Sequence, residues 1–164
     1  MNNIYLIGMP GCGKSTIGKI ISEKLGLKHI DADEYLENKY SQSIPDIFKN
    51  FGEDDFRNKE SIVIKELSEK TNIIVSTGGG VVVRKENKAE MKKSGVVVFI
   101  NTTPQNILAN SSLEGRPLLS DKNRIYDLYN KRIDLYNDFA DIIIDNNSSI
   151  EAAAQKIINQ FNKE

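Results

Sequence analysis

The stretch GMPGCGKST, residues 8–16, decides how the rest of the chain is interpreted. It follows the apolar run IYLI at residues 4–7 and precedes a segment of helical period, and it has the form G-x-x-x-x-G-K-S of a phosphate-binding loop. Glycines in such a loop let backbone N–H groups approach a phosphate, and the following helix directs its positive dipole end at the same group. The sequence therefore predicts a strand, a phosphate-binding loop and a helix, in that order.

The residue types in this loop predict separate contacts with a nucleoside triphosphate. Lys14 is expected to reach the β- and γ-phosphates, and Ser15 is expected to supply a hydroxyl ligand for Mg²⁺. The further nucleotide contacts are predicted at Gly11, Cys12, Gly13 and Thr16.

Composition limits the classes of protein to consider. The 164 residues predict one domain, 1–164, and the 22 basic and 23 acidic side chains indicate no general attraction to nucleic acid or membranes. No apolar run approaches the about 20 residues of a membrane span, and the amino terminus has no signal-peptide pattern, so a cytoplasmic protein is expected. With one histidine and one cysteine, any metal must use oxygen ligands. Cys12 is interpreted as a small loop residue, with a redox-sensitive thiol as the alternative.

The pattern of apolar residues predicts an α/β fold. Short apolar runs at 4–7, 27–31, 73–77, 96–101 and 141–145 alternate with longer segments of helical period, as in a parallel sheet with crossover helices. Helices are predicted at 14–25, 33–40, 53–70, 85–93, 104–110, 125–137 and 149–162.

The remaining motifs favour a small-molecule kinase over other nucleotide-binding classes. The chain lacks the D-x-x-G motif of GTPases, and 164 residues leave little room for the extra elements of a mechanical ATPase. A kinase needs a carboxylate beside the metal, groups that bind the acceptor, and a mobile cation.

Two carboxylates follow the second predicted strand. Asp31 and Asp33 lie two residues apart, at the edge of the sheet where ligands bind in such folds. One of them can face Mg²⁺ while the other faces an acceptor hydroxyl; a role as helix N-cap is the alternative.

Three arginines are candidates for binding anionic groups. Arg57 and Glu60 lie at i and i+3 of a predicted helix, where the carboxylate can hold the guanidinium group, although surface ion pairs have the same spacing. Arg132 lies on a later predicted helix and is open to the same alternative. Arg116 lies in the loop SSLEGRPLLSDKN, residues 111–123, which is interpreted either as a lid that delivers a cation or as a disordered connection.

Taken together, these segments resemble the shikimate kinase family over nearly the whole chain. The matching motifs are GMPGCGKST, DADE at 31–34, FR at 56–57 with Glu60, TGGG at 77–80, GRPLL at 115–119, and KRIDLY at 131–136 with Arg132 and Tyr136. The resemblance implies a three-layer P-loop kinase fold with a five-stranded parallel sheet flanked by helices. It also implies a substrate-binding segment at about 33–60 and a mobile lid at about 111–123.

The resemblance implies transfer of the γ-phosphate of ATP to the 3-hydroxyl of shikimate. Asp33 is then expected to orient or deprotonate this hydroxyl, and Lys14 and Arg116 to act on the transferring phosphate. Ser15 and Asp31 are expected on the Mg²⁺ side, Asp31 through water. The expected shikimate contacts are the carboxylate clamp Arg57 and Arg132 and the backbone N–H groups of Gly79 and Gly80, while Gly78 is assigned to a turn.

One departure from the family pattern concerns adenine. Many members have an arginine over adenine about seven residues before the lid arginine, and a proline in the loop after the last strand; here residue 109 is alanine and the loop reads DNNSSIE. How adenine is held therefore stays open. The alternatives to a shikimate kinase are a kinase for gluconate or a nucleoside monophosphate, and a non-catalytic ligand-binding relative. A monomer without nucleic-acid or membrane partners is expected.

Overall fold

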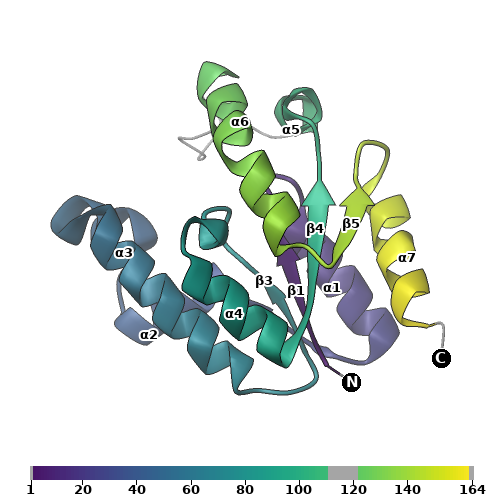
Figure 1. Cartoon of the computed structure of the whole chain (residues 1–164), viewed down its shortest axis with the longest axis horizontal. Helices are drawn as coiled ribbons and strands as arrows, with labels where there is room; N and C mark the ends of the chain where they lie inside the picture. Colours follow the sequence, from purple (N-terminus) through teal and green to yellow (C-terminus); the bar gives the residue numbers. More distant parts are fainter. Residues whose placement is uncertain (1, 111–121, 163–164) are drawn as a thin grey trace.

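Figure 1 shows the computed structural model, which describes residues 2–110 and 122–162. Residues 1, 111–121 and 163–164 lie outside the described part of the chain. Arg116 and most of the predicted lid at 111–123 fall in this range. The prediction of a lid cation therefore rests on the sequence.

The centre of the fold is a parallel sheet of five strands in the order β2-β3-β1-β4-β5. Each apolar run predicted from the sequence forms one strand, and each strand differs from its prediction by one residue at one end. The strands are β1 (Asn3–Ile7), β2 (Lys28–Asp31), β3 (Ile73–Ser76), β4 (Gly95–Asn101) and β5 (Ile142–Asp145).

Helices cover both faces of this sheet, which confirms the predicted three-layer α/β architecture. In Figure 1, α1 and α7 pack together behind the sheet, while α4 and α6 lie in front of it and α2 and α3 flank it. The helices are α1 (Lys14–Leu25), α2 (Ala32–Tyr40), α3 (Ile44–Ser68), α4 (Lys85–Ser94), α5 (Pro104–Asn110), α6 (Lys122–Phe139) and α7 (Ile150–Phe161), with a 3₁₀ turn η1 (Val81–Val83).

The core lies on both faces of the central strands. All residues of β1 and β3 are buried, because helices cover the side chains that point either way. Each such isoleucine, leucine or valine contributes about 1.5–3 kcal/mol of hydrophobic stabilisation relative to an exposed one. The edge strand β5 leaves Ile143 exposed. The apolar runs in the sequence are therefore uninterrupted because both faces of the central strands are buried.

Two helices extend beyond their predicted ends. α3 begins at Ile44 rather than at residue 53. Ser43 caps this earlier start by accepting a hydrogen bond from the Asp46 N–H at 3.2 Å. A proline fits in the first turn, because N–H groups there have no partner within the helix. Gly52, with φ 85° and ψ 176°, interrupts it with a kink. α6 begins at Lys122, so the last two residues of the predicted loop 111–123 are helical.

The strand order brings the carboxyl ends of all five strands to one edge. Asp31 at the end of β2 pairs in register with Ser76 of β3, and Ser76 pairs with Leu6 of β1. On the other side, Asn101 of β4 pairs with Asp145 of β5. The loop after β1 thus lies at the middle of this edge, between neighbours on both sides, where open α/β sheets bind ligands. Within the described ranges, no helix is both long and apolar enough to cross a membrane.

Candidate active site

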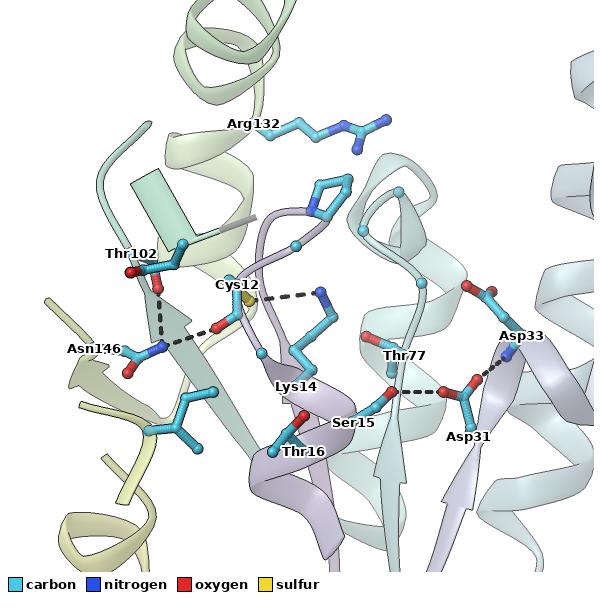
Figure 2. Close-up of a pocket in the computed structure, with 18 of the residues that line it drawn as sticks. Cys12, Lys14, Ser15, Thr16, Asp31, Asp33, Thr77, Thr102, Arg132 and Asn146 are labelled. Carbon is cyan, nitrogen blue, oxygen red and sulfur yellow. Dashed lines mark hydrogen bonds between the residues drawn. The ribbon is translucent and has the colours of Figure 1, made fainter. Parts of the chain in front are cut away.

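A cleft of about 960 Å³ opens along the carboxyl edge of the sheet. It runs from the first half of α3 and the loop after β3, across the phosphate-binding loop, to the loops after β4 and β5. Figure 2 shows the central part, with residues from separate strands and helices pointing into one space.

The phosphate-binding loop is folded around the ammonium group of Lys14. Its Nζ donates hydrogen bonds to the carbonyl oxygens of Gly8 and Met9, both at 2.9 Å. The third proton faces Cys12 Sγ at 3.7 Å, a weak acceptor that a phosphate oxygen can replace. Cys12 is buried, with 3% of its surface exposed. The loop therefore carries its positive charge at its centre.

The first turn of α1 faces the cleft with free backbone donors. Its N-cap, Gly13, has φ 94° and provides no side-chain hydrogen bond to the helix. The N–H groups that begin a helix have no intrahelical partners, so they remain available to an anion. Glycine is required here because the left-handed conformation strains other residues.

Asp31 is a helix N-cap, the alternative that the sequence offered, and it also contacts Ser15. Its Oδ2 accepts a hydrogen bond from Ser15 Oγ at 2.6 Å, and its Oδ1 caps α2 by accepting from the N–H groups of Asp33 and Glu34 at 3.0 and 3.1 Å. The cap and the hydrogen bond to Ser15 hold the carboxylate from both sides (Figure 2).

The Ser15–Asp31 pair fits Mg²⁺ by its chemistry. Mg²⁺ prefers oxygen ligands, and nucleotide-binding proteins hold it through one or two protein oxygens together with phosphates and water. The residues that the structure describes contain no cluster of three or more His, Cys, Asp or Glu side chains able to hold a metal ion. A hydroxyl and a carboxylate beside the phosphate loop are therefore a suitable set for a nucleotide-bound cation.

Asp33 projects from the first turn of α2 into the cleft (Figure 2). Burial, followed by the charge of Asp31, raises the pKa of Asp33 to about 6. A carboxylate with this pKa is ionised at neutral pH and is a stronger base than an ordinary aspartate.

Arg57 and Glu60 form the predicted i, i+3 ion pair, and both are buried rather than on the surface. Arg57 Nη1 donates to Glu60 Oε1 at 2.8 Å, and the two residues are 7% and 4% exposed. Burial raises the pKa of Glu60 to about 6, against the opposing effect of Arg57. Among the described residues, Glu60 Oε2 and Arg57 Nε have no hydrogen-bond partner. Both atoms are buried, and Arg57 Nε lies 3.6 Å from Glu53 Oε1 in a second, longer ion pair.

Arg132 reaches the cleft from α6, and Tyr136 of the same helix is buried beside it. Arg132 extends above the phosphate-binding loop (Figure 2). One turn later, the buried hydroxyl of Tyr136 donates to Gly79 O at 2.6 Å, and burial raises its pKa. Tyr136 thereby holds the glycine segment against α6.

The three glycines of this segment are explained by close contacts. A β-carbon on Gly78 would lie 2.8 Å from Asp33 Oδ1, and one on Gly79 would lie 2.7 Å from the ring of Pro10. A β-carbon on Gly80 would overlap the guanidinium group of Arg57. Gly78 begins a turn, as predicted, because the Val81 N–H donates to its carbonyl oxygen at 3.2 Å. None of the three glycines has a φ in the left-handed region, so the turn conformation itself does not require glycine. The glycines let the acidic, phosphate-binding and arginine parts of the site approach one another.

Four polar residues were missed by the sequence reasoning: Thr102 and Asn146 line the cleft, while Ser76 bonds to Lys14 and His29 bonds to Ser76. The side chain of Asn146 donates to Cys12 O and to Thr102 Oγ1 at 2.8 and 3.2 Å. Ser76 Oγ donates to Lys14 O at 3.0 Å and lies 2.8 Å from His29 Nε2, so the imidazole supplies the proton of the second bond. Ser76 ends a strand, and Thr102 and Asn146 directly follow strands, so their positions at the ligand-binding edge could have identified them.

The described site residues predicted from the sequence all line one cleft. These residues are Gly11, Cys12, Gly13, Lys14, Ser15, Thr16, Asp31, Asp33, Arg57, Gly79, Gly80 and Arg132.

The sequence matches the family model described as shikimate kinase over residues 10–162. The shikimate kinase of Clostridium botulinum (strain Alaska E43) is 43% identical over 157 residues, which span 95% of this chain and 94% of the relative.

Solved structures of the same family have the same fold. The shikimate kinase from Acinetobacter baumannii, in complex with shikimate, is similar with a TM-score of 0.91 and 34% identity, over 98% of this chain and 93% of that one. A gluconokinase from Sinorhizobium meliloti matches with a TM-score of 0.58, 99% and 98% coverage and 13% identity, which is a likeness of fold alone. From the family match, the identity of the relatives and the shared fold, we conclude that this chain belongs to the shikimate kinase family.

Proposed function

We propose that this chain transfers the γ-phosphate of ATP to the 3-hydroxyl of shikimate, giving shikimate 3-phosphate and ADP. The observation that carries the proposal is the position of Asp33, between the phosphate-binding loop and a buried arginine–glutamate pair in one cleft. Such a site suits an acceptor that carries both a carboxylate and a hydroxyl group.

The arginine end of the cleft binds the shikimate carboxylate. Arg57 and Arg132 present planar guanidinium groups that bind carboxylates through paired hydrogen bonds. Glu60 holds Arg57 in position through the bond at 2.8 Å. Phe48 and Phe56 line the same end, where they provide an apolar surface for the carbocyclic ring.

Asp33 accepts the proton of the attacking hydroxyl. Its pKa of about 6 keeps it ionised at neutral pH, and its position in the first turn of α2 directs it toward the phosphate-binding loop. The backbone N–H groups of Gly79 and Gly80 complete the acceptor contacts.

The phosphate-binding loop holds ATP through Lys14, Thr16 and the backbone N–H groups of its glycines and of Cys12. Ser15 and Asp31 would hold Mg²⁺, Asp31 through water, and the bound ion would neutralise negative charge on the β- and γ-phosphates. Arg116, outside the described residues, is proposed as the cation that the lid at 111–123 delivers.

The nucleoside lies at the far end of the cleft. This end is lined by side chains after β4 and β5, and the arginines among the described lining residues, Arg57 and Arg132, lie at the acceptor end. Ala109 is exposed on α5. Among the described residues, the side chains proposed to surround adenine are therefore drawn from Asn106, Asn110, Ser148, Ser149, Ile150 and Glu151.

Two alternatives are less well supported. A nucleoside monophosphate as acceptor would call for several arginines in the lid, and residues 111–123 contain one. A non-catalytic relative has no need of Asp33 beside the phosphate-binding loop. The single domain, the monomeric state and the cytoplasmic location remain predictions from the sequence.

A coupled assay of ADP release tests the proposal. Shikimate, gluconate and CMP are supplied in turn with Mg²⁺ and ATP, and the Asp33→Asn variant serves as the control for background ATP hydrolysis. Release of ADP with shikimate alone is expected. Turnover with gluconate or CMP instead would assign the other acceptor, and no turnover with any of them would indicate a non-catalytic relative.

A further inference from the structure

The side chain of Asn146 joins the loop after β5 to the phosphate-binding loop. Its Nδ2 donates to Cys12 O at 2.8 Å and to Thr102 Oγ1 at 3.2 Å (Figure 2), while its backbone N–H donates to Asn101 O at 2.9 Å. A carbonyl oxygen can only accept, so the amide group that faces Cys12 O must be the NH₂. Asn146 is 8% exposed. The buried Asn146 is thus held by two hydrogen bonds of its side-chain amide and one of its backbone, and one of the three goes to the phosphate-binding loop.

This contact sets the orientation of one peptide bond in the loop. In a trans peptide the carbonyl of Cys12 and the N–H of Gly13 point in opposite directions. Because Asn146 holds the carbonyl toward the loop after β5, the Gly13 N–H points away from that loop. No described residue accepts a hydrogen bond from this N–H, so it is free for a phosphate oxygen.

The peptide needs such support because Gly13 follows it. Gly13 has φ 94°, and glycine visits many other conformations at little energetic cost. A β-carbon on Gly13 would lie 3.2 Å from Ile150 Cδ1 and 4.0 Å from Asn146 Nδ2, which shows how closely both residues pack against the peptide. Ile150 supplies packing, and Asn146 supplies the directional bond.

We infer that Asn146 is a positioning residue for nucleotide binding: its amide orients the peptide between Cys12 and Gly13 so that the Gly13 N–H faces the bound phosphate. Asn146 also connects the nucleoside end of the cleft to the phosphate end, since the loop that carries it lines both. The inference rests on the proposed binding of ATP and is independent of the identity of the acceptor.

Calorimetry with Mg²⁺ and ADP, without shikimate, tests this inference. Asn146→Ala removes the donor and is expected to weaken ADP binding roughly tenfold, the usual effect of one lost hydrogen bond in a buried site. Asn146→Asp is expected to weaken it further, because its carboxylate faces the Cys12 carbonyl and cannot donate. Shikimate binding by both variants is expected to stay within about twofold of the wild type, since no shikimate contact is changed.

Asn159→Asp is the matched control. It places the same negative charge on α7, the helix that follows the loop of Asn146, but Asn159 is exposed and has no bond to the phosphate-binding loop. Its Oδ1 accepts from Gln155 Nε2 at 2.9 Å, and an aspartate can accept this bond. ADP binding by this variant is expected within about threefold of the wild type, as for other exposed charges. Equal weakening by Asn146→Asp and Asn159→Asp would overturn the inference, because general repulsion would then explain both.

The amide signal of Gly13 in a ¹⁵N-correlation spectrum is the direct readout. In the wild type it is expected to shift strongly when ADP binds, and in Asn146→Ala this shift is expected to be much smaller. If the Asn146 variants unfold, Thr102→Val removes the second acceptor of the amide, and a roughly two- to threefold loss of ADP affinity is expected. An unchanged ADP affinity in a folded Asn146→Ala protein, or an unchanged Gly13 shift, would overturn the inference. Failure of the wild type to bind ADP would instead refute the proposed function.

Discussion

Ser15 Oγ lies 2.6 Å from Asp31 Oδ2, which joins the first turn of α1 to the end of β2. The other carboxylate oxygen of Asp31 caps α2. Because the cap fixes the carboxylate independently of any ligand, the two oxygens proposed for Mg²⁺ are already side by side. Ordering them on metal binding therefore requires little loss of conformational entropy.

The first prediction concerns the dependence of the rate on Mg²⁺. Ser15→Ala is expected to raise the Mg²⁺ concentration for half-maximal activity by roughly tenfold or more, because it removes a first ligand while leaving Asp31 in place as the cap. The measurement is a titration of the initial rate with MgCl₂ at fixed ATP and shikimate. Asp31→Asn keeps a good capping residue and serves as the partner variant, with a similar increase expected. If both variants show the Mg²⁺ dependence of the wild type, the pair is not the metal site.

The second prediction concerns the pH dependence of turnover. The pKa of Asp33 is raised to about 6, so the proton acceptor is lost as pH falls through about 6, and kcat/KM for shikimate should then decrease roughly tenfold per pH unit. Asp33→Asn should lower kcat on the order of 10²- to 10⁴-fold and lose this inflection. Its affinity for ADP is expected to stay near that of the wild type. A pH profile of Asp33→Asn that keeps the inflection near 6 would assign it to another group, such as Glu60.

The third prediction concerns stability, and its sign follows from the same pKa. A carboxyl group whose pKa is higher in the folded than in the unfolded state binds protons more tightly when folded, so the free energy of unfolding falls as pH rises from about 4 to 6. Asp33→Asn removes this charge and should stabilise the protein at pH 7.5 by about 1–2 kcal/mol, allowing for partial exposure. The gain should disappear near pH 4. Urea unfolding of both proteins at the two pH values measures it, and a gain that is larger at pH 4 would contradict the assigned direction.

The fourth prediction separates two neighbouring glycines. A β-carbon on Gly80 meets the Arg57 guanidinium group, so Gly80→Ala should raise KM for shikimate more than KM for ATP. A β-carbon on Gly79 lies 2.7 Å from Pro10 in the phosphate-binding loop, so Gly79→Ala should raise KM for ATP as well. Steady-state kinetics with each substrate varied in turn provide the comparison. If KM for shikimate and KM for ATP rise in the same proportion in both variants, the two substitutions displace residues 78–80 together, and the prediction is wrong.

Much of the fold could be read from local pattern. The strand at 73–76 begins with three buried β-branched residues, and the helix at 14–25 follows directly from the phosphate-binding motif. The first half of α3 was missed because its signals are two single residues: Ser43, which caps it, and Gly52, which looks like the end of a helix but makes a kink within α3. Residues that disfavour a helix, such as glycine, show where a chain can turn, while tertiary packing decides whether the helix continues beyond them.

The sequence by itself determined the α/β class and the chemistry of the motif residues, since these depend on local period and on residue type. Only the tertiary structure decided how the parts meet. It showed that Arg57 and Glu60 are a buried pair, that Asp31 both caps a helix and holds Ser15, and that Asn146 supports Cys12 across 134 positions of the chain. It also explained why residues 78–80 are glycines: Asp33, Pro10 and Arg57 occupy the space that β-carbons there would need. Contacts of this kind depend on the strand order, because residues distant in sequence become neighbours only when the sheet aligns their strand ends.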